Sequence, residues 1–339
     1  MPDLSGFTPI LIFVLALAIA FDYINGFHDT ANAIATSVST RALKPHWAIL
    51  MSATANFAGA LTGTEVAKTI GSGLVDPSFE TGLSGQIVVA AALIGAIAWN
   101  LLTWRLGIPS SSSHALIGGL LGAVAAAAGF GAWQADGIVG RVLVPLVGSP
   151  VIGILGGLLL MVVIFNVFRR AHPRLMNDGF RRLQVLSAGY MAFSHGSNDA
   201  QKTMGIMTLA LVTAGVQTSV EPPLWVILVA ATAISLGTAA GGWRIIKTMG
   251  TKVVKLDPVH GFAAETTAAT IIFGASNLGM PVSTTHVISS AIMGTGSADK
   301  FNAVRWGVAR NIGIAWVLTL PAAGLTAAVS YVLLHAILV

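Results

Sequence analysis

The segment HGSNDAQKT, residues 195–203, places an acid and a base in the middle of a stretch that otherwise has the composition of a membrane helix. A related segment, NGFHDTANA, occupies residues 25–33. When the two are aligned, Asp29 matches Asp199, and the two positions are 170 residues apart. Charged side chains inside an apolar helix are costly, so a pattern that carries them twice indicates a duplicated functional element.

A second motif is repeated in the same order. LGIPSSSSH at 106–114 aligns with LGMPVSTTH at 278–286, 172 residues later. Two motifs that recur in order at nearly one offset indicate an internal duplication. The sequence therefore predicts a first transmembrane repeat at 1–168, a basic loop at 169–182 and a second transmembrane repeat at 183–339.

The composition sets the class of protein. Of 339 residues, 55% are hydrophobic and 9% are charged, whereas soluble domains carry about 25% charged residues. Uncharged runs such as 86–104 and 150–168 approach the roughly 20 residues that cross a bilayer. The net charge of +5 is better explained by basic cytoplasmic loops than by a nucleic-acid partner. The absence of cysteine excludes disulfides, thiolate nucleophiles and Cys-ligated metals.

The order of spans and basic loops predicts the topology. An odd number of spans between equivalent points makes the second copy enter the membrane from the opposite side, which is the inverted-repeat layout of many secondary transporters. The basic loops place the N-terminus outside the cell and the loop 169–182 in the cytoplasm. The fold class is therefore an all-α polytopic membrane protein with two inverted repeats of about five spans each and broken helices at mid-membrane. The spans expected in the first copy are 8–35, 47–63, 86–104, 115–130 and 150–168.

Each LG-x-P motif predicts a helix, a break and a new helix. Gly107 and Gly279 suit the position after a helix end, and Pro109 and Pro281 suit the first turn of the next helix. A helix start exposes N–H groups and the positive end of its dipole, which binds anions. The alternative is Ser/Thr-rich helix packing. The side chains expected at a site for a tetrahedral oxyanion are Ser111, Ser112, Ser113, His114, Ser283, Thr284, Thr285 and His286.

The acidic motifs lie within predicted spans. Such residues are usually paired or line a watery path, and carboxylates beside amides can hold Na⁺ or a proton. Lys202 follows Asp199 by three residues, so it either pairs with that acid or serves as a counter-charge for a bound anion. The residues expected to couple a cation or proton are Asp22, His28, Asp29, Asn32, Asn198, Asp199 and Glu265; Asp29 and Asp199 would be the metal ligands if the cation is sodium.

With these motifs the sequence resembles the inorganic phosphate transporter (PiT) family over nearly its whole length. The resemblance rests on GFHDTAN and GSNDAQK, and on PSSSSH and PVSTTH. It implies inverted repeats, phosphate near the serines and threonines, coupling cations near the aspartates, and a tendency to form dimers. His28 and Lys202 stand where the family signature usually has Asn. These departures resemble the bacterial low-affinity, proton-coupled branch and put the sodium sites in doubt.

We therefore predict a secondary transporter of the bacterial cytoplasmic membrane that imports inorganic phosphate by proton symport, with or without an accompanying metal ion. The alternatives within transport are sodium symport, a sulfate permease and a passive anion channel. An intramembrane hydrolase built on Ser111–Ser113 and His114 is disfavoured, because a nucleophile is needed once and a symmetric binding site twice. No catalytic residue, cofactor or nucleic-acid partner is expected.

Overall fold

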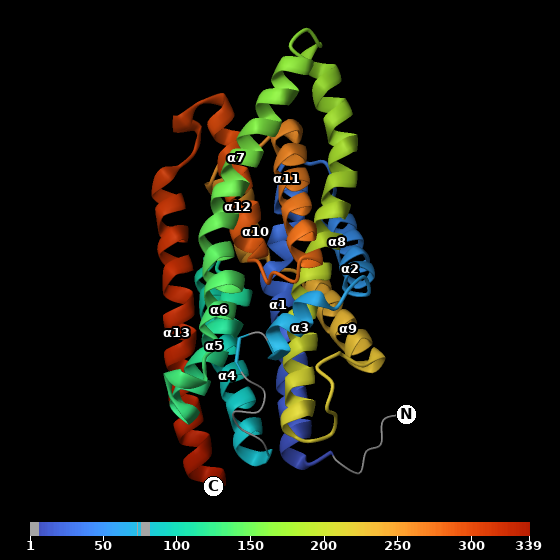
Figure 1. Ribbon diagram of the computed structural model, residues 1–339. Helices are drawn as coiled ribbons and strands as arrows, with labels where there is room; N and C mark the ends of the chain where they lie inside the picture. Colours follow the sequence, from blue (N-terminus) through green and yellow to red (C-terminus); the bar gives the residue numbers. More distant parts are fainter. Residues whose placement is uncertain (1–6, 73, 76–81) are drawn as a thin grey trace.

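The computed structural model describes residues 7–72, 74–75 and 82–339, which fold into a bundle of long and short helices (Figure 1). The first six residues, predicted to lie outside the cell, are not among those described. The first half contains α1 (Pro9–Ser39), α2 (Pro45–Ala60), α3 (Glu65–Ser72), α4 (Gly82–Leu106), α5 (Ser112–Ala128), α6 (Ala135–Ile138) and α7 (Val144–Val167). The second half contains α8 (Pro173–Thr213), α9 (Leu224–Ala240), α10 (Trp243–Lys247), α11 (Pro258–Asn277), α12 (Thr284–Asp299) and α13 (Trp306–Leu338).

Several helices are long and apolar enough to cross a membrane. Within the described residues these are α1, α4, α13 and the continuous helix Ala135–Val167, which joins α6 to α7 through a π-helical turn. The bent pair formed by α9 and Trp243–Lys252 makes a fifth candidate, with an angle of 61° at the break. The chain is a multi-pass membrane protein, as its composition predicted.

The breaks after α4 and α11 lie at the predicted motifs. Gly107 (φ +66°) and Gly279 (φ +67°) both adopt the left-handed conformation that ends a helix and disfavours any side chain. The prediction that Pro109 and Pro281 begin the next helix is wrong. Each proline lies in the non-helical connection, and the helices begin three residues later, after the N-cap residues Ser111 and Ser283.

The basic segment after α7 is mostly helical and not a loop throughout. Pro173 occupies the first turn of α8, and the His172 side chain accepts a hydrogen bond from the Arg174 N–H at 3.3 Å. Residues 173–182 are therefore the first turns of a helix of 41 residues. In Figure 1 this end of α8 and the end of α7 project together beyond the rest of the bundle.

α1 and α8 form the centre of the molecule and pack against each other. α1 also packs on α4 and α9, and α8 packs on α2 and α11. The close crossing of α1 and α9 needs small residues, because a Cβ on Gly26 would lie 2.3 Å from the carbonyl oxygen of Ile234. This packing buries the middle of α1 and α8, where the acidic motifs lie.

Candidate functional site

The starts of α5 and α12 meet at the centre of the molecule. Ser113 Oγ of α5 lies 3.3 Å from the carbonyl oxygen of Val282, just before α12, and donates to it. Each start is capped in the same way, since Ser111 Oγ accepts from the His114 N–H at 3.1 Å and Ser283 Oγ accepts from the His286 N–H at 3.2 Å. The sequence prediction that two interrupted segments come together here is confirmed by these contacts.

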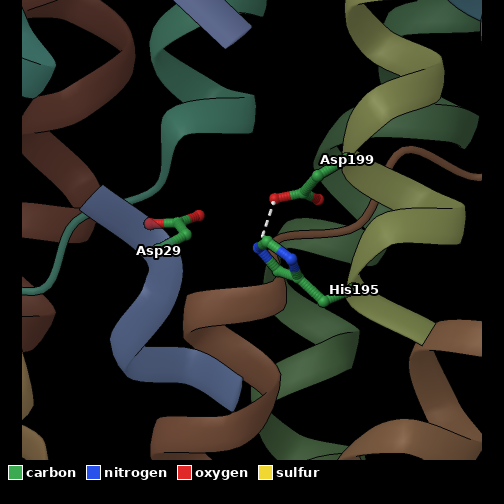
Figure 2. Close-up of side chains that lie close together, drawn as sticks. All are labelled: Asp29, His195 and Asp199. Atoms are coloured by element: carbon green, nitrogen blue, oxygen red, sulfur yellow. Dashed lines mark ion pairs between the residues drawn. The ribbon is translucent and has the colours of Figure 1, made fainter. Parts of the chain in front are cut away.

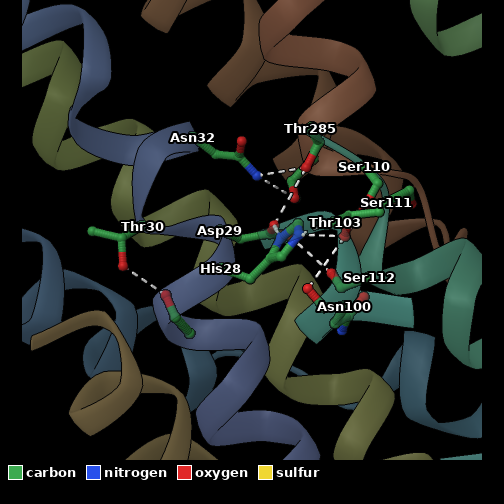
Figure 3. A network of polar contacts seen from close by, with 12 residues as sticks. His28, Asp29, Thr30, Asn32, Asn100, Thr103, Ser110, Ser111, Ser112 and Thr285 are labelled. Carbon is green, nitrogen blue, oxygen red and sulfur yellow. Dashed lines mark hydrogen bonds and ion pairs between the residues drawn. The ribbon is translucent and has the colours of Figure 1, made fainter. Parts of the chain in front are cut away.

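Asp29, on α1, receives hydrogen bonds from both helix starts (Figure 3). Ser112 of α5 donates to Oδ2 at 2.9 Å, and Thr285 of α12 donates to Oδ1 at 3.5 Å. His28 Nδ1 lies 2.6 Å from Oδ1, and its Nε2 lies 3.1 Å from the hydroxyl of Thr103 on α4. The carboxylate is only 2% exposed, so these groups take the place of water around it.

Asp199 has an equivalent setting on α8. Thr284 Oγ1 of α12 donates to its Oδ2 at 3.2 Å, and Lys202 Nζ donates to its Oδ1. His195 Nε2, one turn earlier on α8, lies 3.2 Å from Oδ2. Lys202 also donates to Ser113 Oγ and to the Val282 carbonyl oxygen, so its ammonium group sits between the two helix starts.

Asp29 and Asp199 face each other across a small polar centre. In Figure 2 the two carboxylates point toward one another from α1 and α8, with the ring of His195 beside them. One ligand atom from each of these three residues lies within 4.8 Å of the others, a spacing that can hold a cation. The structure therefore brings the two acidic motifs together in one place.

The two predicted asparagines have different partners. Asn32 Nδ2 donates to the hydroxyls of Thr284 and Thr285 at 3.2 and 2.9 Å, and so holds the start of α12 against α1. Asn198 Nδ2 donates to the Met280 carbonyl oxygen at 3.4 Å, in the connection before α12. Each asparagine therefore holds the start of α12, or the connection before it, through its amide nitrogen. Its amide oxygen is left without a partner among the described residues.

His114 and His286 contact each other behind the two helix starts. Their ring centroids are 4.8 Å apart, and His286 also stacks on Trp316 of α13 at 4.0 Å. Both side chains are buried, and neither ring nitrogen of His286 has a hydrogen-bond partner among the described residues. The ring of His286 is therefore held by its aromatic neighbours in this structure.

Asp22 and Glu265 lie outside this centre. Asp22 is two helical turns before Asp29 on α1 and is fully buried. Glu265 of α11 accepts hydrogen bonds from Thr36 of α1 and from Gln184 and Ser187 of α8. The structure therefore places these two acids on opposite sides of the Asp29–Asp199 centre along α1.

Two contributors to the centre were not among the predicted site residues. His195 precedes Asp199 by four residues, so the i, i+4 spacing on a helix was a signal that it shares the face of the acid. Thr103 gave no such signal, because it meets His28 only through the packing of α4 on α1.

Comparisons with known proteins show the family of the chain. Two segments of the chain, 25–177 and 168–327, match the sequence profile described as the phosphate transporter family. A protein of Bacillus subtilis (strain 168) named "Probable low-affinity inorganic phosphate transporter" is 50% identical over 327 residues, which cover 96% of this chain and 97% of the relative. The protein of that name from Rhizobium meliloti (strain 1021) is 48% identical over 325 residues, or 95% of this chain and 96% of the relative. A solved structure named "The sodium-dependent phosphate transporter" superimposes with a TM-score of 0.90 at 28% identity, covering 98% of this chain and 100% of the other.

Proposed function

The chain belongs to the phosphate transporter family, and from that premise we propose that it imports inorganic phosphate across the cytoplasmic membrane by proton symport. The observation that carries this proposal is the meeting of two capped helix starts at two buried aspartates, with the ammonium group of Lys202 between them. The same family and the transporter names of the relatives disfavour the intramembrane hydrolase.

The helix starts and the hydroxyls beside them are suited to a tetrahedral oxyanion. The N-terminal ends of α5 and α12 each supply the positive end of a helix dipole. Lys202 adds a full positive charge at the same point. The proposed phosphate ligands are the side chains predicted from the sequence at the two helix starts. Among them, Ser111 and Ser283 act mainly as the N-caps that hold the backbone in place.

Cation binding and phosphate binding are linked because they use the same hydroxyl hydrogens. A hydroxyl has one hydrogen to donate. In this structure Ser112 gives its hydrogen to Asp29, and Thr284 gives its hydrogen to Asp199. A proton or metal cation on these carboxylates replaces the hydroxyl donors, which are then free to turn toward phosphate. Phosphate binding therefore requires a cation on the aspartates, as symport demands.

The side chains beside the aspartates favour a proton over sodium. His28 and Lys202 place an imidazole and an ammonium group against Asp29 and Asp199, in positions a free cation would otherwise take. Sodium symport is the alternative, supported by the sodium dependence that the name of the structural relative gives for that protein. Asp29, His195 and Asp199 form a group whose ligand atoms are close enough to bind one cation. An imidazole nitrogen is a better ligand for a transition metal than for a hard cation such as sodium. This composition supports the transport of phosphate as a metal–phosphate complex.

The contacts between helices support two inverted repeats as the machinery for alternating access. α1 packs on α9 while α8 packs on α2, and α5 packs on α13 while α12 packs on α7. In Figure 1, α1 begins at the end of the bundle opposite to the start of α8. We accordingly propose the predicted repeats 1–168 and 183–339, the N-terminus outside the cell, and the basic segment 169–182 in the cytoplasm. We also propose that the protein forms a homodimer, and this rests only on its resemblance to the PiT family.

The membrane potential explains why phosphate needs a coupling ion. Moving one charge through 100 mV costs about 2.3 kcal/mol, and divalent phosphate entering a negative interior costs about twice that. One proton with monovalent phosphate, or two cations with divalent phosphate, cancels this electrical cost. The two aspartates supply one site in each half of the molecule.

Uptake of labelled phosphate into proteoliposomes, with a pH gradient and a sodium gradient imposed separately, tests the proposal. We expect accumulation with the acidic side outside and none with sodium alone, and we expect excess unlabelled phosphate to compete where sulfate does not. Asp178→Asn, at an exposed position of α8, is the matched control for Asp29→Asn and Asp199→Asn. Uptake that follows sodium and ignores pH would favour the sodium alternative, and downhill flux without accumulation would favour a channel.

A further inference from the structure

One face of α1 carries a continuous polar stripe through the centre of the molecule. Its members are spaced three or four residues apart, which places them on one side of a helix. All are buried. Seven residues of helix span roughly 10 Å, so the stripe extends about that far on each side of Asp29. The stripe consists of Asp22, Asn25, Asp29, Asn32 and Thr36.

At one end of the stripe, Asp22 is a buried acid with no ion pair of its own among the described residues. Its nearest donors are uncharged, the side chains of Asn25 and Thr203, and neither makes a hydrogen bond of good geometry to a carboxyl oxygen. The charged groups that act on Asp22 are Asp199 and Lys202 of α8, which are already bonded to each other. A carboxyl group that is buried without an ion pair of its own is suited to carry a proton.

At the other end, Glu265 is a buried acid held by three uncharged donors. It accepts from the hydroxyls of Thr36 and Ser187 and from Gln184 Nε2 at 3.1 Å. The orientation of the Gln184 amide is fixed because its oxygen accepts from Thr40 at 2.7 Å. These three donors are uncharged, and no charged group of the described chain acts on Glu265. The donors stabilise the ionised form while burial opposes it, so Glu265 is suited both to accept a proton and to release it.

The two ends of the stripe lie toward opposite ends of the molecule. Gln184 and Ser187, which hold Glu265, follow directly after the basic segment of α8, whereas Thr203 near Asp22 is about five turns farther along that helix. Figure 1 shows α8 running from the projecting basic end down through the bundle. Asp22 is therefore on the side predicted to face outward and Glu265 on the side predicted to face the cytoplasm.

We propose that the coupling proton follows this α1 stripe, with Asp22 as the outer proton carrier, the Asp29–Asp199 centre as the middle station and Glu265 as the inner acceptor. The inference rests on the proposed function and adds the route and the order of the stations. In each transport cycle the proton leaves the Asp22 carboxyl group, which becomes a carboxylate, and the Glu265 carboxylate becomes a carboxyl group before it releases the proton inward. Phosphate passes between the starts of α5 and α12, beside this route and not along it.

Asp22→Asn and Glu265→Gln test the route, because each resembles the protonated acid and cannot release a proton. Phosphate exchange at equal pH needs no net proton movement, whereas accumulation driven by a pH gradient does. In proteoliposomes we expect both variants to exchange labelled phosphate and to lose gradient-driven accumulation and proton influx, the latter followed with a pH dye inside the vesicles. Asp178→Asn is the control and is expected to behave as the unsubstituted protein.

Proton influx coupled to phosphate in both variants, at the stoichiometry of the unsubstituted protein, would overturn the route. Loss of exchange in a variant whose thermal unfolding is unchanged would overturn it too, by placing that residue in the phosphate site. If either variant fails to fold, Asp22→Glu and Glu265→Asp keep an acid and must retain proton influx. An unsubstituted protein that neither exchanges nor accumulates phosphate would instead contradict the proposed function itself.

Discussion

The ammonium group of Lys202 and the carboxylate of Asp199 form a buried ion pair one turn apart on α8, with exposures of 1% and 0%. The sequence left open whether Lys202 pairs with this acid or neutralises a bound anion. The structure shows the ion pair, and because Lys202 also reaches Ser113 it stands where an anion at the helix starts would meet it. This position supports the proposed second role of Lys202, which is to neutralise the charge of bound phosphate.

Lys202→Met is expected to destabilise the protein and abolish uptake. Removing one member of a buried pair leaves the other charge uncompensated, at a cost of about 3–5 kcal/mol. Lys202→Met combined with Asp199→Asn is expected to recover the thermal stability but not the transport. The unfolding temperature in detergent and phosphate uptake measure the two effects. Lys68→Met is the control, since Lys68 pairs at 3.2 Å with the exposed Glu65 and Glu221, and such pairs contribute about 0–1 kcal/mol. Equal stability losses in the two single variants would contradict the interpretation.

His28→Asn combined with Lys202→Asn is expected to allow phosphate uptake only when sodium is present, because a bound sodium ion would replace the lost positive charge of Lys202. Both changes remove a side chain that lies against an aspartate and put an amide oxygen, a ligand for hard cations, in its place. Uptake is measured at constant pH with and without an inward sodium gradient. Asp178→Asn, far from the site, is expected to show no such response. Sodium stimulation already present in the unsubstituted protein would remove the basis of this prediction.

Ser112→Ala is expected to raise the phosphate concentration needed for half-maximal uptake by roughly tenfold, since a hydrogen bond to a charged group contributes about 1.5–3 kcal/mol. It also removes the hydroxyl that donates to Asp29 in this structure, so the dependence of uptake on pH is expected to shift with the affinity. The concentration and pH dependence of initial uptake measure both. Thr326→Ala, an exposed hydroxyl on α13, is the control. A change in affinity with no change in pH dependence would argue that the hydroxyl does not link the two ligands.

Local sequence patterns predicted the parts of the site that depend on local structure. The glycine of each LG-x-P motif placed the helix breaks, because a left-handed residue after a helix is a local requirement. The same patterns missed the position of the new helix starts, since the serine caps follow the prolines by two residues. The apolar composition predicted the class of fold, and the duplicated motifs predicted which acids belong together.

Contacts between distant segments could not be predicted from one sequence. Asn32 bonds to Thr285 across 253 residues, and only the packing of α1 against α12 brings them together. The ring contact of His114 with His286 likewise depends on how the two helix starts face each other. The sequence predicts a loop at 169–182, whereas the structure has a helix from Pro173 onward. Clustered charged residues occur both in loops and in solvent-exposed helices, so the charge pattern could not distinguish the two.

Gly279→Ala is expected to lower the thermal stability more than Gly107→Ala. Both positions have positive φ, which costs an L residue about 1–2 kcal/mol. At Gly279 a Cβ would also lie 3.2 Å from the Glu65 carbonyl oxygen, whereas at Gly107 the nearest atom is at 3.6 Å. Gly274→Ala, in the open on α11, is the control and is expected to stabilise the helix by up to about 1 kcal/mol. The unfolding temperatures of the variants in detergent measure these losses. An unchanged unfolding temperature in Gly279→Ala would show that the helix break does not require glycine at this position.

The thermal stability is expected to fall at alkaline pH through His260, at the start of α11. Its Nδ1 lies 2.8 Å from Asp257 and its Nε2 lies 2.9 Å from Asp299, and both carboxylates are about half exposed at the water-facing ends of α11 and α12. Burial by itself lowers the pKa of His260, but the hydrogen bond to Asp257 and the charges of both aspartates outweigh it and raise the pKa above its ordinary value. A raised pKa means that the contribution to stability is complete below the unfolded pKa, about 6.5, and is lost as pH rises through the folded pKa. His260→Gln is therefore expected to flatten the decline of the unfolding temperature above neutral pH, with His335→Gln near the end of α13 as the control. An equally steep decline in His260→Gln would show that another group titrates.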